Sequence, residues 1–342
     1  MSQAVDEGAL LTALRAGDEV AFNDLADRHR GELLLHCYRM LGSFQDAEDM
    51  LQETLLRAWR GLASFEGRSA VRSWLYKIAT NVCLDALASR RRRVLPSTIQ
   101  SAANPRDPLP APMQEQPWIE PIPDQLIDVR SSVNPEAHYD AHESVTLAFL
   151  ATLQTLPSRQ RAVLILRDVL GFGASEAADL LDASVPSVNS ALQRARASMK
   201  AFSSGPRSPG EERVETEQTA TLLSRYVEAW QAPDAERLVA LLREDVVFTM
   251  PPLPLWCQGP EAIRRFLDQH LFSQQPPPRF RLVAAQANGG PAFAVYQRDE
   301  TGAYRLGALQ VLSIEQGKIG AIHDFLAFDH QLFERFGLPL AL

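Results

Sequence analysis

The sequence has no long apolar run and no excess of positive charge, and each shortage excludes a class of protein. No stretch reaches the roughly 18 apolar residues that a membrane-spanning helix requires, so we predict no membrane partner. The N-terminal segment lacks the basic start and long apolar core of a secretory signal, so we expect a cytoplasmic location. A formal net charge of -8 argues against indiscriminate binding along nucleic acid, which needs many cations to neutralise phosphates.

Cysteine is also scarce. The three cysteines, Cys37, Cys83 and Cys257, lie far apart, are odd in number, and show neither CxxC nor Cys/His spacing. This pattern predicts neither a disulfide framework nor a metal site, and it is typical of a reducing compartment. We expect no metal and no cofactor.

Proline is concentrated, and its distribution divides the chain of 342 residues. Residues 96–140 hold 9 of the 23 prolines and more acids than bases, which predicts an acidic linker. Trp118, Ile119 and Ile122 are unusual in a purely solvated spacer. Residues 204–215, rich in Gly, Pro and Ser, form a second linker. The predicted folded domains are residues 1–95, 141–203 and 216–342.

Apolar residues at helical spacing predict an amphipathic helix in the stretch DAEDMLQETLLRAWRGL. Ser43 precedes it by the spacing of a capping box with Asp46. A leucine lies among acids and an amide on the opposite face, which suits a docking surface as well as a solvated one. That face carries Asp49, Gln52, Glu53 and Leu56.

The next helix, SAVRSWLYKIATNVCLDALASRRRR, is expected to begin with Ser69 as N-cap. Trp74, Lys77 and Asn81 share one edge of it and offer a stacking ring, a phosphate partner and an amide, which is the chemistry of single-strand binding. Packing of Trp74 in the core is the alternative. The four arginines at 90–93 repel one another unless an anion is near, although a solvated tail is also consistent.

A helix-turn-helix is predicted between residues 174 and 200, where the turn DAS separates two helical patterns. Ser184 caps the second helix and Pro186 suits its first turn. Its predicted inward stripe is Val185, Val188, Leu192, Ala195 and Met199. Asn, Gln and Arg side chains on its other faces suit base edges and phosphates, and an exposed polar helix is the alternative.

Taken together, two stretches resemble sigma factors of the sigma-70 type, in the extracytoplasmic-function (ECF) group: HCYRMLGSFQDAEDMLQETLLRAWRGLASFEGRSAVRSWLYKIATNVCLDAL for region 2 and LPSRQRAVLILRDVLGFGASEAADLLDASVPSVNSALQRARA for region 4. The resemblance covers about the first 200 residues and implies two all-α domains, a helical bundle and a helix-turn-helix. The implied partners are core RNA polymerase, promoter DNA and an anti-sigma protein. The linker would run through the polymerase toward its active centre.

The resemblance also implies roles for individual residues. The clamp helices of the polymerase would bind Asp49, Gln52, Glu53 and Leu56. The -10 element would be captured by Phe65, Arg68, Trp74, Lys77 and Asn81. The -35 element would be read by Ser187, Asn189, Ser190, Gln193, Arg194 and Arg196. One position departs from the family: Asp182 occupies the turn where many relatives have Gly, and we expect it to tolerate a left-handed backbone.

In residues 216–342, two or three amphipathic helices are followed by strand-like runs, and the turns DETG and EQGK predict hairpins. This order resembles the SnoaL-like fold, an α+β cone, for which we expect a curved antiparallel sheet. Met250, Trp256, Tyr296 and His323 are candidate pocket residues. His323 and Asp324 are neighbours on a strand and so point to opposite faces, which argues against a catalytic pair.

We therefore predict a non-enzymatic ECF sigma factor that directs core polymerase to promoters, with a C-terminal domain that regulates it intramolecularly. Two alternatives remain: a bifunctional protein whose C-terminal domain binds or converts a small molecule, and a plain helix-turn-helix repressor that ignores polymerase.

Overall fold

The computed structural model describes residues 12–13, 17–62, 65, 70–113, 115–127, 144–202, 215–272, 279–328 and 330–342. The chain forms two compact units. The first comprises residues 1–93 and 126–204, and the second residues 94–125 and 205–342. The domain boundaries drawn from the sequence stay a prediction, but the structure assigns most of the proline-rich segment to the second unit.

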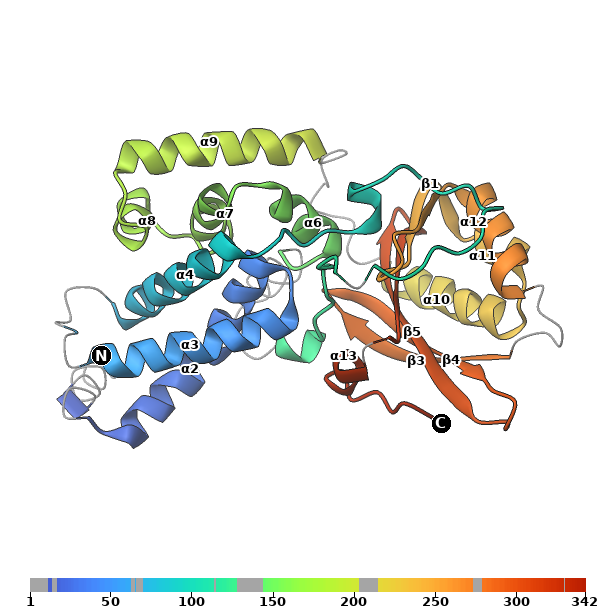
Figure 1. Ribbon diagram of the computed structural model, residues 1–342, viewed down its shortest axis with the longest axis horizontal. Helices are drawn as coiled ribbons and strands as arrows, with labels where there is room; N and C mark the ends of the chain where they lie inside the picture. The colour runs from blue at the N-terminus through green and yellow to red at the C-terminus, as the bar shows by residue number, and fades with distance from the viewer. Residues whose placement is uncertain are drawn as a thin grey trace. The chain divides into compact units, whose positions relative to one another are not determined.

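The first unit is helical (Figure 1). Its amino-terminal bundle is formed by α2, α3 and α4, and its second bundle by α6, α7, α8 and α9, with one π-helical turn, η5. The bounds are α2 Glu19–Leu41, α3 Phe44–Gly61, α4 Val71–Ser89, α6 Leu147–Thr155, α7 Ser158–Leu164, η5 Ile165–Val169, α8 Ala174–Leu180 and α9 Val185–Phe202.

The helix ends of the amino-terminal bundle follow local signals. Ser43 is the N-cap of α3, as predicted, and its side chain accepts a hydrogen bond from the backbone N–H of Asp46. Gly42 ends α2 with a φ of 71°, a backbone conformation that favours glycine. The predicted N-cap of α4, Ser69, lies outside the described residues, and the N-cap position of the observed helix is Ala70, without a side-chain cap.

The two bundles of the first unit are joined by buried arginines. Arg161 of α7 donates to the backbone oxygen of Met40 in α2 and, at 3.2 Å, to that of Leu156. Arg39 of α2 donates to Ser144 Oγ at 2.7 Å. Burial lowers the pKa of each guanidinium to about 10. Because a buried cation is costly without hydrogen-bond acceptors, these contacts favour the observed packing of the two bundles.

The second unit contains a six-stranded sheet of order β2-β1-β6-β5-β4-β3. Its strands are β1 Leu242–Thr249, β2 Trp256–Gln258, β3 Phe280–Ala287, β4 Gly290–Arg298, β5 Tyr304–Glu315 and β6 Lys318–Leu326. The predicted antiparallel pairing holds for four neighbouring pairs, β2–β1, β6–β5, β5–β4 and β4–β3, and it is wrong for β1, which runs parallel to β6. Both predicted hairpins are present, and Gln316 and Gly317 take positive φ in the second.

Helices pack against the sheet around one core (Figure 1). They are α10 Glu215–Gln231, α11 Ala235–Val239 and α12 Pro260–Leu267, extended by the π-helical η6 Asp268–Phe272, with α13 His330–Glu334 near the C-terminus. Tyr226 and Trp230 of α10, Phe248 of β1 and Phe266 of α12 are buried in this core. Of the helices that the structure describes, none is long and apolar enough to cross a membrane.

The segment Val94–Gln125 is an ordered part of the second unit. It contains two short 3-10 turns, η2 Pro96–Thr98 and η3 Asp124–Leu126, the second of which ends one residue beyond the unit boundary. Trp118, Ile119 and Ile122 are buried, which accounts for apolar residues in a predicted spacer. This part of the chain is therefore not a purely solvated spacer, in line with the unusual apolar residues noted in its sequence.

Candidate nucleic-acid and protein interfaces

The outer face of α3 presents most of the predicted polymerase-binding residues. Asp49 and Gln52 are exposed, and the Leu56 side chain is 50% exposed, which is unusual for an isolated leucine among polar residues. Glu53 is half-buried, and its carboxylate accepts a hydrogen bond from Arg57 at 2.7 Å. Asp49, Gln52 and Leu56 therefore form the accessible part of this surface.

A groove of about 480 Å³ between α2 and α3 adjoins this surface. The rings of Phe22 and Trp59 pack there with centroids 5.1 Å apart. Glu19, Asn23 and Asp27 contribute polar groups along the α2 side at a spacing of four residues. Sequence reasoning missed this contribution of α2, although that spacing was a signal for it. The lining residues are Glu19, Phe22, Asn23, Ala26, Asp27, Arg30, Gln52, Leu55, Leu56 and Trp59.

The predicted -10 residues are only partly accessible. Trp74 is half-buried and packs on the buried ring of Phe65, with centroids 4.8 Å apart. Asn81 is half-buried on the same helix, and Arg68 lies outside the described residues. Lys77 is engaged with the second bundle: its Nζ donates to Asp182 Oδ1 at 2.6 Å and to the backbone oxygen of Asp179 at 3.0 Å.

The arginine run at the end of α4 has internal partners. Arg93 Nη2 lies 2.7 Å from Asp46 Oδ2, and Arg90 pairs with the other oxygen of the same carboxylate. Arg92 donates to the backbone oxygen of Gln154. The sequence predicted an anion near these guanidinium groups, and that anion is Asp46 of α3. Three of the four arginines therefore bind groups of the protein itself.

The helix-turn-helix has the predicted geometry. Ser184 caps α9 through the backbone N–H of Ser187, and Asp182 takes a φ of 47° in the turn, as expected. Val188, Leu192 and Ala195 are buried, whereas Val185 is 37% exposed and Met199 half-buried, so the inward stripe is shorter than predicted.

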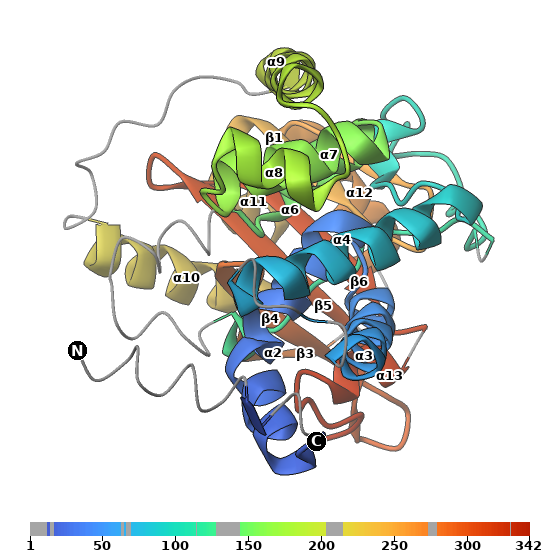
Figure 2. The same ribbon diagram turned by 90° about the vertical axis from the view of Figure 1, so that its left-hand side faces the viewer.

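All six predicted -35 residues are exposed on α9: Ser187, Asn189, Ser190, Gln193, Arg194 and Arg196. In both views of the unit, α9 lies on the side of α7 and α8 that faces away from α4 (Figure 1 and Figure 2). Arg196 makes two hydrogen bonds to Asp168, at 2.6 and 2.8 Å, so this arginine already serves the bundle. Arg194 donates to Ser190 Oγ at 2.8 Å.

The four predicted pocket residues of the second unit lie on several different strands or strand ends. Trp256 is on the edge strand β2 and Tyr296 on β4, with three strands between them, which corresponds to about 19 Å. Trp256 Nε1 donates to the backbone oxygen of Gln100, and Tyr296 Oη donates to that of Pro339. Met250 is buried at the end of β1, and His323 Nδ1 bonds Thr249 Oγ1 at 2.9 Å. These are structural contacts.

A different polar cluster lies inside the second unit. Tyr226 Oη donates to Gln310 Oε1 at 2.6 Å, and Gln310 is the cross-strand neighbour of Asp324. Burial raises the pKa of Asp324 to about 7, with the Gln310 side chain opposing the shift. Sequence reasoning weighed Asp324 only beside His323 and missed its pairing with Gln310, because β-sheet register is not visible in a single strand.

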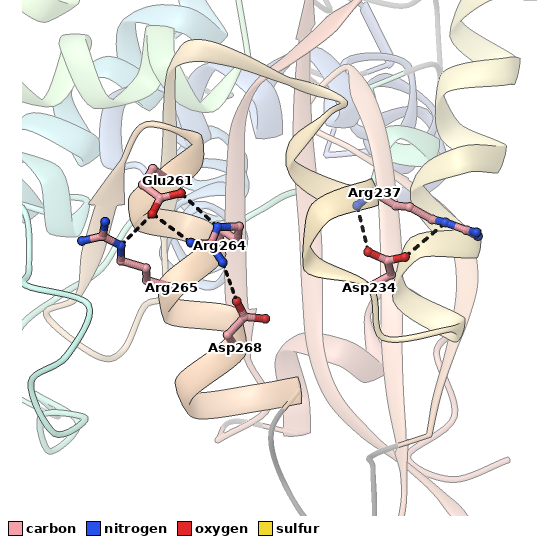
Figure 3. A network of polar contacts seen from close by, with 6 residues as sticks. All are labelled: Asp234, Arg237, Glu261, Arg264, Arg265 and Asp268. Carbon is pink, nitrogen blue, oxygen red and sulfur yellow. Dashed lines mark hydrogen bonds and ion pairs between the residues drawn. The ribbon is translucent and has the colours of Figure 1, made fainter.

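The charges on α11 and α12 are paired within their own helices (Figure 3). Glu261 accepts hydrogen bonds from Arg264 and Arg265, which lower the pKa of its carboxyl to about 2. Arg264 also contacts Asp268 at 3.1 Å. This part of the second unit therefore offers no free basic patch. Among the residues that the structure describes, no cluster of His, Cys, Asp or Glu has the arrangement of a metal site.

Three family models match successive parts of the chain. The model for Sigma-70 region 2 matches residues 25–93, that for Sigma-70, region 4 matches residues 146–199, and that for the SnoaL-like domain matches residues 223–322. The chain is 42% identical over 337 residues to ECF RNA polymerase sigma factor SigG of Mycobacterium tuberculosis (strain ATCC 25618 / H37Rv), covering 96% of this chain and 86% of SigG. The chain belongs to the ECF sigma factors.

Other relatives agree with this assignment. ECF RNA polymerase sigma factor SigM of the same organism is 31% identical over 191 residues, which cover 56% of this chain and 81% of SigM. The crystal structure of Mycobacterium tuberculosis ECF sigma factor SigJ has the same fold, with a TM-score of 0.58 at 21% identity over 93% of this chain and 99% of SigJ. The predicted family, fold class and sigma-factor function are confirmed, and the repressor alternative loses its support.

Proposed function

We propose that this ECF sigma factor binds core polymerase through the outer face of α3 together with the adjoining α2–α3 groove. This assignment rests on the exposed Leu56, which shares a face of α3 with the exposed Asp49 and Gln52. An apolar side chain surrounded by polar groups is the usual centre of a protein interface. The acids at the rim suit a partner helix that carries basic and apolar side chains.

Leu56→Glu tests this assignment. It places a charge at the centre of the surface, and we expect the affinity for purified core polymerase to fall at least tenfold in a fluorescence binding assay. Phe328→Glu is the matched control, since Phe328 is a 63% exposed apolar side chain on the other unit. Equal losses for the two variants would remove α3 from the interface.

We also propose that α4 and α9 contact the two promoter elements. Lys77 and Asn81 offer a phosphate and a base partner on α4, and Asn189 and Gln193 are exposed on α9. Gln193→Ala should change the preferred base at one -35 position, at a cost of roughly 1–3 kcal/mol, when promoters are selected from a randomised library. Lys200→Ala, which removes a charge near the end of α9, should weaken all sequences alike.

The C-terminal domain has a regulatory role in this proposal, because it holds the segment that joins the two sigma regions. Ala103 N donates to the backbone oxygen of Trp256 at 2.8 Å, and Met113 N to that of Pro252 at 3.0 Å. Ile122 and Asn288 make two hydrogen bonds: Asn288 N donates to the backbone oxygen of Ile122 at 3.0 Å, and Ile122 N donates to Asn288 Oδ1 at 3.1 Å. A segment held in this way is not available to extend along the polymerase.

Run-off transcription with purified core and genomic DNA tests this role. We expect a chain ending at residue 204, which lacks the holding surface, to differ from the full-length protein in promoter-dependent activity. Unchanged activity and unchanged core affinity would refute regulation by the C-terminal domain.

Small-molecule binding by the C-terminal domain is a second candidate. It is favoured by three polar atoms of the second unit that are buried without a hydrogen-bond partner: Trp230 Nε1, Gln310 Nε2 and Asp324 Oδ1. The sigma regions themselves are not catalysts. Conversion of a ligand by the C-terminal domain is examined in the same experiment as its binding. Native mass spectrometry of the full-length protein after incubation with neutral carbonyl and hydroxyl compounds would detect a complex, and Asp324→Asn should change it.

A further inference from the structure

Within the first unit, the helix-turn-helix bundle contacts α4, the helix assigned to the -10 element (Figure 2). The Phe172 ring packs edge-on against Tyr76, with centroids 5.4 Å apart, and the Arg72 guanidinium lies over both rings. Beside them Lys77 reaches Asp182 and the backbone of Asp179. The second bundle therefore occupies the main cation of the edge that was assigned to DNA.

Asp182 is an unfavourable residue for its position in two respects. Its φ of 47° lies in the left-handed region, which aspartate tolerates at a conformational cost that glycine does not have. Its carboxylate, 70% exposed, also adds negative charge to a motif that approaches phosphates. Both costs are unexplained if the turn serves only DNA recognition. They are explained if the carboxylate has a function in the protein without DNA.

The contact is incompatible with a fully engaged promoter. The -10 and -35 elements are roughly 25 base pairs apart by their names, or about 85 Å along the DNA at 3.4 Å per base pair. α9 has 18 residues and is about 27 Å long. Lys77 and the turn that precedes α9 are 2.6 Å apart, so the two reading surfaces cannot reach both elements while this packing persists.

We propose that Asp182 and Lys77 form a latch that holds the helix-turn-helix bundle on α4 and masks Lys77 until polymerase and promoter DNA separate the two bundles. The proposal rests on the assignment of Lys77 to the promoter strand made above. An exposed ion pair is weak, worth a factor of about two to five in an equilibrium, so the latch tunes a closed state that the buried contacts of Arg39 and Arg161 also stabilise.

The first experiment measures binding of the full-length protein to a fluorescent 30-nucleotide single strand of degenerate sequence, at fixed ionic strength. Asp182→Asn removes the charge and keeps a residue that tolerates the left-handed backbone. Asp179→Asn is the matched control, because it removes one charge from the same motif but leaves the backbone oxygen that Lys77 contacts. We expect two- to fivefold tighter binding for Asp182→Asn than for Asp179→Asn.

The advantage of Asp182→Asn should disappear when Lys77→Ala is present in both proteins, since the latch acts only through Lys77. Equal affinities of the two single variants, or an advantage that persists without Lys77, would overturn the latch.

A further comparison shows whether the assignment of Lys77 to promoter DNA is itself wrong. If adding Lys77→Ala to Asp182→Asn, where the latch is open, leaves single-strand affinity unchanged, Lys77 does not bind DNA, and the masking role is refuted. Hydrogen exchange of the full-length protein then decides whether the contact still controls closure. Faster exchange in α4 and α8 for Asp182→Asn than for Asp179→Asn supports a closing contact, and equal exchange refutes it.

Discussion

The buried carboxyl of Asp324 makes the stability of the C-terminal unit depend on pH in a direction opposite to that of an ordinary aspartate. Asp324 is 3% exposed, faces Gln310 across the sheet, and has one oxygen without a hydrogen-bond partner. Burial raises its pKa from 3.8 to about 7. The folded protein therefore binds this proton more tightly than the unfolded chain does, and stability decreases as the pH rises.

The size of the effect follows from the two pKa values. A pKa raised from 3.8 to about 7 corresponds to roughly 4 kcal/mol that is present below pH 4 and lost once the pH passes 7. Between pH 5 and pH 8 this one carboxyl should reduce the free energy of unfolding by about 3 kcal/mol. Asp324→Asn replaces it with a group of similar shape that does not titrate.

We expect Asp324→Asn to raise the unfolding temperature at pH 8 and to have a much smaller effect at pH 5. Thermal unfolding of both full-length proteins is followed at several pH values. The difference between their unfolding temperatures at each pH reports on Asp324 alone, because the titration of all other groups affects both proteins equally. Asp299→Asn is the control, because Asp299 is held ionised by Thr301 and Arg305 and its pKa is lowered to about 2. A wild-type-to-variant difference that is the same at pH 5 and pH 8 would refute the reasoning.

Three further changes test other parts of the structure. Arg161→Ala leaves the buried oxygens of Met40 and Leu156 without a donor and should destabilise the first unit by roughly 3 kcal/mol in denaturant unfolding; a loss below 1 kcal/mol would contradict this. Ser43→Ala removes the N-cap of α3 and should cost about 1 kcal/mol by the same measurement, whereas Ser43→Asp should restore most of it. Asn288→Ala removes the side-chain hydrogen bond to Ile122 and places alanine at a φ of 56°, which strains the backbone, so proteolysis within residues 94–125 should accelerate. Asn288→Gly also removes the hydrogen bond but suits this φ, so it separates the loss of the bond from the strain.

Much of the first unit was predictable because its signals are local. Ser43, Ser184 and Pro186 mark helix starts, and the spacing of Val188, Leu192 and Ala195 identifies the buried side of α9. The positive φ at Asp182 followed from its place in a known turn. Helical periodicity also distinguished the exposed face of α3 from its buried face, since that contrast repeats every three to four residues.

Contacts between segments far apart in the chain could not be predicted in the same way. The partner of Lys77 is 105 residues away, and nothing in either local sequence selects the pair. The predicted pocket residues were chosen by type, and their spacing across the sheet could not be predicted because it depends on strand order. Asn288 and Gly289 were a readable turn signal that was overlooked, and their turn proved to hold the connecting segment.

The attachment of Val94–Gln125 at separate points bears on how this protein tolerates changes of length. Ala103 is fixed at Trp256, and Ile122 is fixed at Asn288. Insertions or deletions between Ala103 and Met113, whose backbone N–H is held by Pro252, change the length of a mostly exposed stretch. They leave the buried Trp118 and Ile119 and the point of departure toward the next helical bundle where they were. The same change placed after Ile122 would shift that point, so the two halves of one proline-rich stretch should drift at very different rates in evolution.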